Sequence, residues 1–490
     1  MRLLKNYGLL AIGSLFLSNT LYASGFYSPL HSANQLARGG ASMTETKHAD
    51  VVAVNPAGMA FLSQGWHISG SLITVSGGFE WDGPDPDTGS QTTGSATVEG
   101  SVLPSLQLTK SAGSGGRFHY GFAIKTPFGN KLDWGKSWAG RELGTNAEFG
   151  MVSLNPNIAY AINKQQAFSI GMSYTTAQNK ASRVIRMSNL PSIGGVELGL
   201  KGQDVGEVVS NFEGTAIHWN IGYLGSFQPG FLDKKQVLLV AAHYLSPLQM
   251  KYQGTLDFPP TPMDVDPQAG LEFKDLNAKM TQNLPWILEL GLGWKDHSLH
   301  PTFEIEVGLV RVGWSNYHDV LVELDDPSTF FANSPFAQDV SETTNDSGQT
   351  VKVAKKVAEP RNYKDANTYR IGGAWHFQDR WTWMAGMASD EDPVPSKYRE
   401  PLLPLGTIFT IATGIEWEWK EKQAISFQLA VNQMPRVKTK DTVFSVIDGT
   451  ETDVSTALEA QTDPSILNIP FVGGYKGQTQ LLSVSYHASW

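Results

Sequence analysis

Apolar and polar side chains alternate along much of the chain, most clearly in PWILELGLGWKD, residues 285–296. Every second residue from Trp286 to Trp294 is apolar, and the residues between them include Glu289 and Lys295. This period of two predicts a β-strand with one apolar face and one mainly polar face. The two indoles lie about 27 Å apart along such a strand. A tilt of about 40° reduces this to roughly 21 Å of height, close to the apolar band of an outer-membrane barrel with its aromatic girdles.

The same alternation recurs along the chain and predicts fourteen strands. We expect these strands at 66–77, 100–110, 117–127, 147–161, 166–178, 212–228, 236–251, 285–296, 300–314, 367–378, 380–389, 405–420, 423–435 and 477–490. Short turns alternate with long links, of which the longest are 179–211, 252–284, 315–366 and 436–476. A soluble sandwich also alternates, but short turns on one side and long loops on the other are typical of outer-membrane barrels. The expected fold is therefore all-β, a 14-stranded antiparallel transmembrane β-barrel over residues 66–490.

The first 23 residues predict a secretory signal peptide. Arg2 and Lys5 precede the apolar run LLAIGSLFL, which is too short to span a bilayer, and a small residue, Ala23, ends a plausible cleavage site. An uncleaved anchor is the alternative. Together with the barrel pattern, this leader predicts a protein of the outer membrane of a Gram-negative bacterium.

The composition excludes several kinds of chemical site and partner. The chain has no cysteine, which excludes disulfides, thiol catalysis and cysteine metal sites. A net charge of −10 argues against a nucleic-acid partner. Ser485 and His487 share a strand face, but no third member of a catalytic triad is evident. His297 and His300 flank a short turn and are too few for a metal site. We therefore predict no enzyme activity, no cofactor and no metal.

Residues 24–65 lie between the leader and the first strand and do not alternate. We expect this compact segment to form a hatch that plugs the barrel lumen. Asn55 predicts a helix cap, Pro56 suits the first helical position before Ala57, and Gly65 is expected to close the last turn. The alternative is a disordered periplasmic tail with a chance Asn-Pro turn.

Several motifs resemble the FadL family of outer-membrane long-chain fatty acid transporters. They are Gly25-Phe26, ARGGAS at 37–42, NPAGMAFL at 55–62, TPFG at 126–129, WAGR at 138–141, SLNPNIAYAI at 153–162, YKDANTYRIGGAW at 363–375 and DEDPVPSKYREPLLP at 390–404. The chain ends in Trp490, where the family usually ends in Phe, and the long loops show no match. The resemblance implies a fourteen-stranded barrel, an N-terminal hatch, a pocket for a hydrophobic ligand, and an inward kink of the third strand that opens the wall laterally.

The resemblance therefore implies a passive transporter that binds long-chain fatty acids or related hydrophobic compounds and releases them inward through a lateral opening. A transporter of aromatic hydrocarbons and a plugged general porin are the alternatives. The expected partners are the hydrophobic small molecule, outer-membrane lipid, and the barrel-assembly machinery, because the last strand ends in an aromatic residue. No nucleic-acid partner is expected.

A fatty acid needs an apolar cleft with cations at its head group. By resemblance, Lys364 and Arg183 are candidate head-group ligands, with Lys180 or Arg186 as alternatives to Arg183. Phe26 resembles the N-terminal residue that reaches the family's pocket, and simple packing is the alternative for it.

Lys125 and Arg370 are further candidates because they fall on inward strand faces. The alternative for both is pairing with inward acids such as Glu289 and Glu416.

The third strand, RFHYGFAIKTPFG, contains the residues expected at a break in pairing. Gly121 lacks a side chain and Pro127 cannot donate to a ladder. By the resemblance, we expect the lateral opening at Gly121, Ala123, Thr126 and Pro127. Alternatively, Gly121 makes room for the hatch and Pro127 marks the end of the strand.

Overall fold

The computed structural model describes residues 26–27, 31–86, 88–112, 116–186, 204–230, 232, 235–259, 275–296, 303–328, 336–344, 348, 350–439, 442–447 and 468–490. The predicted signal peptide, Gly25, His297 and His300 lie outside these residues. Among the helices that are described, none has the length and apolar character needed to cross a membrane.

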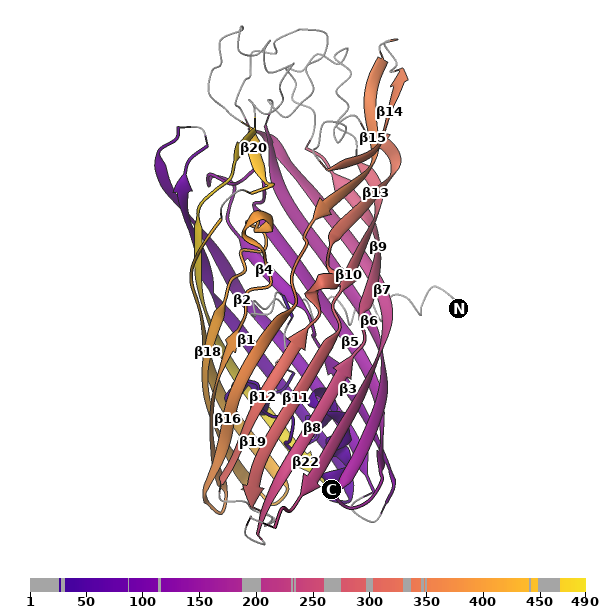
Figure 1. Cartoon of the computed structure of the whole chain (residues 1–490), viewed down its shortest axis with the longest axis vertical. Helices are drawn as coiled ribbons and strands as arrows, with labels where there is room; N and C mark the ends of the chain where they lie inside the picture. The colour runs from indigo at the N-terminus through magenta and orange to yellow at the C-terminus, as the bar shows by residue number, and fades with distance from the viewer. Residues whose placement is uncertain are drawn as a thin grey trace.

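The wall is one closed antiparallel sheet of twenty strands that follow fourteen tracks around the barrel (Figure 1). The strands are β1 (Gly65–Pro84), β2 (Gln91–Ser111), β3 (Phe118–Lys125), β4 (Gly129–Asp133), β5 (Asn146–Ala161), β6 (Gln166–Arg186), β7 (Asp204–Phe227), β8 (Gln236–Leu245), β9 (Leu248–Asp257), β10 (Leu276–Leu284), β11 (Ile287–Asp296), β12 (Phe303–Val312), β13 (Asp319–Ser328), β14 (Ala337–Thr344), β15 (Thr350–Pro360), β16 (Ala366–Gln378), β17 (Trp381–Asp390), β18 (Ile408–Lys420), β19 (Gln423–Lys438) and β22 (Gly474–Ser489). Five tracks carry two strands each, namely β3–β4, β8–β9, β10–β11, β12–β13 and β15–β16, and β14 is a hairpin extension of β15. Pairing of β1 with β22 closes the barrel, so the predicted fold class is confirmed.

The side chains on these strands face the lipid or the lumen as the alternation predicts. On β11, Leu290 and Leu292 are 40% and 45% exposed on the outside, whereas Glu289 is buried inside. On β22, Leu482 faces outward and Ser485 faces the lumen. A barrel in a bilayer needs this arrangement, because its outer face meets hydrocarbon.

The predicted strand lengths are wrong at one end of the barrel. β6 continues to Arg186 and β7 already begins at Asp204, so the expected link 179–211 is much shorter. Likewise, 252–284 contains the end of β9 and all of β10, and 315–366 contains β13, β14 and β15. The sequence expectation followed the apolar band, but strands continue to pair beyond it, where their outer faces no longer need apolar side chains.

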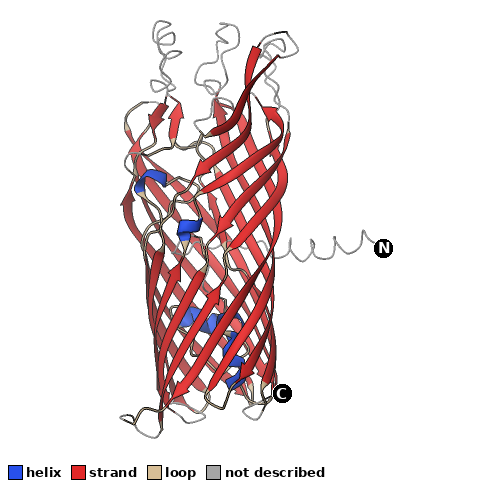
Figure 2. Ribbon diagram, turned by 45° about the vertical axis from the view of Figure 1, so that its right-hand side comes forward, coloured by secondary structure: helices blue, strands red, loops and turns tan. Residues whose placement is uncertain are grey.

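Three short helices lie inside the barrel in Figure 2: α2 (Ala33–Ala37), α3 (Val51–Val54) and the 3₁₀ helix η1 (Pro56–Phe61). They belong to what we call the N-terminal segment, residues 31–64. α2 packs on β17, β18 and β19, whereas η1 packs on β5, β6 and β7. Wall glycines permit this approach: a side chain at Gly121 would collide with Met59 and Val52, and one at Gly386 would collide with the backbone of Arg38.

Asn55 organises the turn between α3 and η1. Its Oδ1 accepts the N–H of Ala57 (3.3 Å), and Pro56 occupies the start of η1. Its Nδ2 also donates to the carbonyl of Tyr223 on β7 (3.0 Å), so one amide both caps the helix and attaches it to the wall. The expected helix closure at Gly65 is wrong. η1 ends at Phe61, and Gly65 instead begins β1, where a side chain would collide with the Trp490 carbonyl.

Two further 3₁₀ helices, η4 (Trp314–Asn316) and η5 (Ser396–Tyr398), and the two-stranded sheet of β20 (Ser445–Ile447) and β21 (Asn468–Pro470) complete the described elements. η4 lies between β12 and β13, and η5 lies in the loop between β17 and β18.

Replacing Asn55 with Ala should loosen the N-terminal segment without unfolding the barrel. The cap contributes about 1 kcal/mol, and the bond to Tyr223 is lost with it. Hydrogen exchange of residues 31–64 should accelerate, while the heat-modifiable gel shift of the barrel should stay. Thr93→Ala, at an exposed position of β2, is the control; equal exchange in all three proteins would contradict the cap.

Candidate functional site

A cavity of about 390 Å³ lies inside the barrel, between the N-terminal residue Phe26 and the loop that follows β17. Apolar side chains from several strands form most of its wall. They include Phe149, Val184, Val208, Phe212, Leu256, Met280, Val320, Val322, Phe336, Leu402 and Leu403. Cavities of this size that are mainly apolar with a few polar groups are typical of small-molecule sites.

Phe26 forms part of the cavity wall within a cluster of aromatic rings. It is 1% exposed, and its ring centre lies 4.9 Å from that of Trp314, 5.3 Å from that of Phe149 and 5.6 Å from that of Tyr317. These distances are those of favourable aromatic pairs. Phe26 therefore lines the cavity and is also packed among aromatic rings.

The cavity also holds a cluster of charged side chains. Arg183 from β6 and Arg361 from the link between β15 and β16 line it together with Glu359 and Glu400. Arg361 lies 3.0 Å from Glu359 and 3.2 Å from Glu400. Burial raises the pKa of Glu400 to about 7, although the nearby arginines oppose that shift. In the part of the chain that is described, no residue accepts a hydrogen bond from the Arg183 side chain or forms an ion pair with it.

The other predicted cations lie elsewhere. Lys364 is exposed and does not line the cavity; its backbone N–H donates to the carbonyl of Pro393 (2.8 Å). Arg370 is buried and lies 3.4 Å from Glu289, so it forms the pair with an inward acid that was its alternative. Lys125 is 1% exposed inside the barrel, away from the cavity lining.

The sequence reasoning missed Arg361 and Glu400. Arg361 lies three residues before the expected Lys364, and Glu400 lies inside the DEDPVPSKYREPLLP motif. The alternative Lys180 also lines the cavity, whereas the side chain of Arg186 lies outside the described residues.

The barrel wall has a gap in its pairing between β2 and the β3–β4 track. Pairing ends at Leu106↔Ile124 and is next seen at Thr97↔Asp133, in the same register. Within the described strands, residues 98–105 of β2 form no pair on this side. On the other side of the track, β5 pairs with both β3 and β4, and its pairing register shifts by one residue between them. We call this region the wall gap.

Of the four residues predicted to form a lateral opening, two lie in the paired part of the wall and two lie at the wall gap. Gly121 pairs with Thr109, and Ala123 pairs with Gln107, so both lie where β2 and β3 are joined. Thr126 and Pro127 lie in the interruption between β3 and β4.

Phe26 and Tyr27, which precede the N-terminal segment, bind backbone groups beside the wall gap. Tyr27 forms a bridge with Phe128, and the N–H of Gly129 donates to the carbonyl of Phe26 (3.2 Å). The chain just before the N-terminal segment therefore replaces part of the missing strand contact.

Inward carboxylates attach the N-terminal segment to the wall. Glu304 lies 3.0 Å from Arg38, and Glu306 accepts the backbone N–H groups of Met43 and Thr44 (2.8 Å each). Glu416 lies 2.6 Å from the ammonium of Lys47. Buried charges must be paired in this way to be tolerated.

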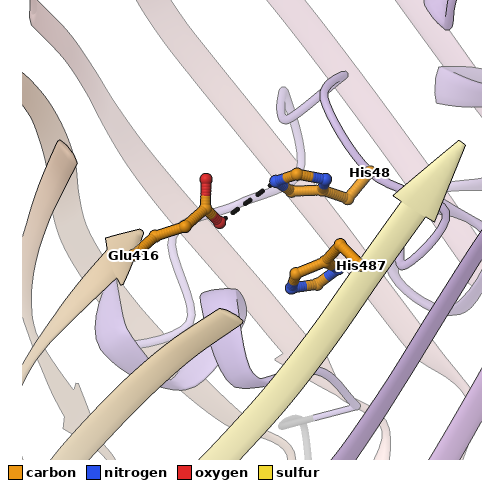
Figure 3. A group of neighbouring side chains, drawn as sticks. All are labelled: His48, Glu416 and His487. Carbon is orange, nitrogen blue, oxygen red and sulfur yellow. Dashed lines mark hydrogen bonds and ion pairs between the residues drawn. The ribbon is translucent and has the colours of Figure 1, made fainter. Parts of the chain in front are cut away.

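Glu416 also forms a group with two histidines, shown in Figure 3. His48 Nε2 lies 3.0 Å from a Glu416 oxygen, and the rings of His48 and His487 are stacked with centres 4.0 Å apart. Two stacked imidazoles cannot both direct an in-plane lone pair at one ion. Each ring nitrogen of His487 also lies within hydrogen-bonding distance of a serine hydroxyl, and Lys47 already supplies a positive charge. The arrangement therefore fits an ion pair better than a metal site.

The sequence profile of the family described as outer membrane protein transport protein (OMPP1/FadL/TodX) matches residues 14–467. The long-chain fatty acid transport protein of Salmonella typhi is 20% identical over 344 residues, 66% of this chain and 68% of that protein. Its counterpart from Escherichia coli K12 is 21% identical over 348 residues, 66% of this chain and 69% of that protein.

Two solved structures share the fold. A Pseudomonas aeruginosa FadL homologue superposes with a TM-score of 0.67 at 16% identity, over 95% of this chain and 99% of that one. The Pseudomonas putida toluene transporter TodX superposes with a TM-score of 0.59 at 14% identity, over 97% and 99%.

The attachment of the N-terminal segment should weaken as the pH rises. Burial lowers the pKa of His48, but the charge of Glu416 and its hydrogen bond to the ring together outweigh burial and raise the pKa above its ordinary value of 6.5. A raised pKa means that the ion pair stabilises fully below the ordinary pKa and is lost as the pH rises through the raised value. Limited proteolysis of residues 31–64 should therefore accelerate with pH above 6.5.

His48→Gln should remove most of this pH dependence while keeping a hydrogen-bonding side chain. His67→Gln is the matched control, because His67 is also buried but contacts the Ser63 carbonyl rather than a carboxylate. A pH profile that is unchanged in His48→Gln would show that another group controls the attachment.

Proposed function

The chain belongs to the outer membrane protein transport protein family (OMPP1/FadL/TodX), and we propose that it takes up long-chain fatty acids through the outer membrane of a Gram-negative bacterium. It is an outer-membrane transporter of fatty acids or hydrophobic aromatic compounds and not an enzyme. The finer assignment to fatty acids, and the route that the ligand takes, are the proposal.

One observation carries the choice of ligand: an apolar cavity has a guanidinium, that of Arg183, with no hydrogen-bond partner among the described residues. Guanidinium groups bind carboxylates through strong charge-assisted hydrogen bonds. Arg183 is half-buried, so a ligand that brings the anion would give this cation a strong partner where water reaches it only in part. A long-chain carboxylate supplies both the apolar tail and that charge.

Aromatic hydrocarbons are the second candidate, and a specific observation favours them. Phe26, Phe149, Tyr317 and Trp314 form an aromatic cluster at the cavity, which suits an aromatic ring. A hydrocarbon would leave Arg183 without a partner, so we rank this candidate second. A plugged general porin ranks below both, because residues 31–64 occupy the lumen.

We further propose that residues 31–64 act as the hatch and that the ligand leaves through the wall gap. An apolar chain loses about 0.8 kcal/mol for each CH₂ group that it exposes to water. Leaving sideways into the bilayer avoids that loss, whereas leaving downward through an aqueous lumen does not. The missing β2 pairs near Thr126 and Pro127 support this route.

Arg183→Ala should weaken oleate binding by about 10- to 100-fold, because a hydrogen bond to a charged group is lost. Binding of oleyl alcohol, which has no charge, should change little. Lys364→Ala is the informative comparison, since Lys364 is exposed outside the cavity. Isothermal titration with detergent-solubilised protein measures each affinity. A loss confined to Lys364→Ala would move the head-group site to that residue.

Oleate affinity should also fall as the pH rises through about 7. The pKa of Glu400 is raised to about 7, so this carboxyl is neutral below that pH and repels a second carboxylate above it. Glu400→Gln should bind oleate with nearly constant affinity between pH 6 and 8, a range chosen as about one unit either side of this pKa. A pH dependence that persists in Glu400→Gln would exclude this carboxyl as its source.

Closing the wall gap should stop uptake without disturbing the barrel. Because the chain contains no cysteine, the pair Pro104→Cys and Thr126→Cys can be joined by a short bis-methanethiosulfonate linker. Uptake of oleate should stop and should return on reduction with dithiothreitol. Leu72→Cys and Val484→Cys, which pair in the intact wall, provide the control. Full uptake by the linked gap variant would show that the ligand leaves by another route.

A further inference from the structure

Lys125 has an unusual position at the edge of the wall gap. It is the last residue of β3, pairs with Ser153 on β5, and follows the last residue of β3 that pairs with β2. Its side chain is 1% exposed. No described residue accepts a hydrogen bond from its ammonium.

The charges around Lys125 do not neutralise it. Its charge acts on Glu289, His218 and His243. Glu289 carries the negative charge in this group, but Arg370 (3.4 Å) and His243 (3.6 Å) already contact its carboxylate. The inside of the wall therefore carries excess positive charge at Lys125, and a buried charge without a partner is costly unless an anion joins it.

Neighbouring strands add polar atoms that also lack partners. Asn155 Nδ2 on β5, and His218 Nε2 and Asn220 Nδ2 on β7, make no hydrogen bond to any described residue. Their side chains are 0%, 5% and 1% exposed. Asn155 pairs with Ala123, two residues before Lys125 on the same face of β3, and the charge of Lys125 acts on His218. Asn220 lies two residues beyond His218 on the same inner face of β7. Each asparagine Nδ2 carries two hydrogens, and His218 Nε2 carries one in the Nε2–H tautomer of the neutral ring, so all three nitrogens can donate, as an anion requires.

We infer that Lys125, Asn155, His218 and Asn220 form a second anion subsite, which receives the carboxylate of the fatty acid while its tail enters the wall gap. This inference rests on the proposed function. The first head-group site is Arg183 in the cavity, and the second lies at the exit.

The positions along β5 support two separate subsites. Asn130, which lines the cavity, pairs with Phe149, whereas Lys125 pairs with Ser153 four residues further along. Four residues span roughly 13 Å of strand. Because residues 26–27 bind the backbone of Phe128 and Gly129 between these levels, the head group must pass them to move from one subsite to the other.

Uptake of radiolabelled oleate and oleyl alcohol into proteoliposomes of pure phosphatidylcholine tests the inference. Lys125→Met should take up oleate about tenfold more slowly, as expected for the loss of one charge-assisted hydrogen bond. It should take up oleyl alcohol at the wild-type rate, and oleate binding at the cavity should persist. Lys125→Arg should restore oleate uptake. Lys110→Met, at an exposed position of β2, is the matched control.

The outcomes separate this inference from the proposed function. A wild-type protein that takes up neither compound overturns the proposed function. If Lys125→Met takes up oleate at the wild-type rate, or loses uptake of oleate and oleyl alcohol equally, the second subsite alone is overturned. Adding phosphatidylglycerol tests a lipid head group as the occupant. If this lipid slows oleate uptake in the wild type but not in Lys125→Met, the subsite binds an anionic lipid and the inference is overturned.

Discussion

No backbone N–H or C=O group can remain unpaired in hydrocarbon, and this constraint determines the rest of the structure. It requires the sheet to close, which it does where β1 pairs with β22. It also makes any gap in the wall costly, unless other groups take the place of the missing pairs. The gap between β2 and the β3–β4 track is therefore informative, because the fold keeps it despite this cost.

The N-terminal residues reduce the cost of the gap. Tyr27 and Phe26 bind the backbone of Phe128 and Gly129, where the track has left β2. The same Phe26 side chain forms part of the cavity wall. One dipeptide therefore contacts both the ligand cavity and the wall gap, so a ligand that displaces Phe26 also disturbs the backbone contacts beside the gap.

The sequence predicts the parts of the molecule that obey a local rule. Alternation on β11 and β22 gives the faces, because lipid and lumen impose opposite polarity on successive residues. Asn55 and Pro56 are recognisable because a cap depends on neighbours in the chain. Phe26 and Arg183, which are named from the family resemblance, both line the cavity, and their role there stays a prediction.

The remaining features depend on contacts between distant residues, so no local pattern reveals them. Arg361 and Glu400 meet across 39 positions of sequence, and neither alternation nor composition indicates that they share a cavity. The extent of the wall gap depends on where β2 and β3 separate, and Gly121 shows why this is hard to predict. Its missing side chain makes room for Met59 rather than for a break in pairing.

The distribution of charge inside the barrel separates attachment from transport. Inward acids at Glu304, Glu306 and Glu416 are bound by the N-terminal segment, so they stabilise its position and offer nothing to an anionic ligand. Arg183 and Lys125 lack such partners among the described residues, and they lie at the cavity and at the wall gap. If the proposed ligand is a carboxylate, it would pass from the half-buried Arg183 to the buried Lys125 and find a cation at each end. Phe26 and Tyr27, which bind the backbone between these two levels, would then be the obstacle on that path.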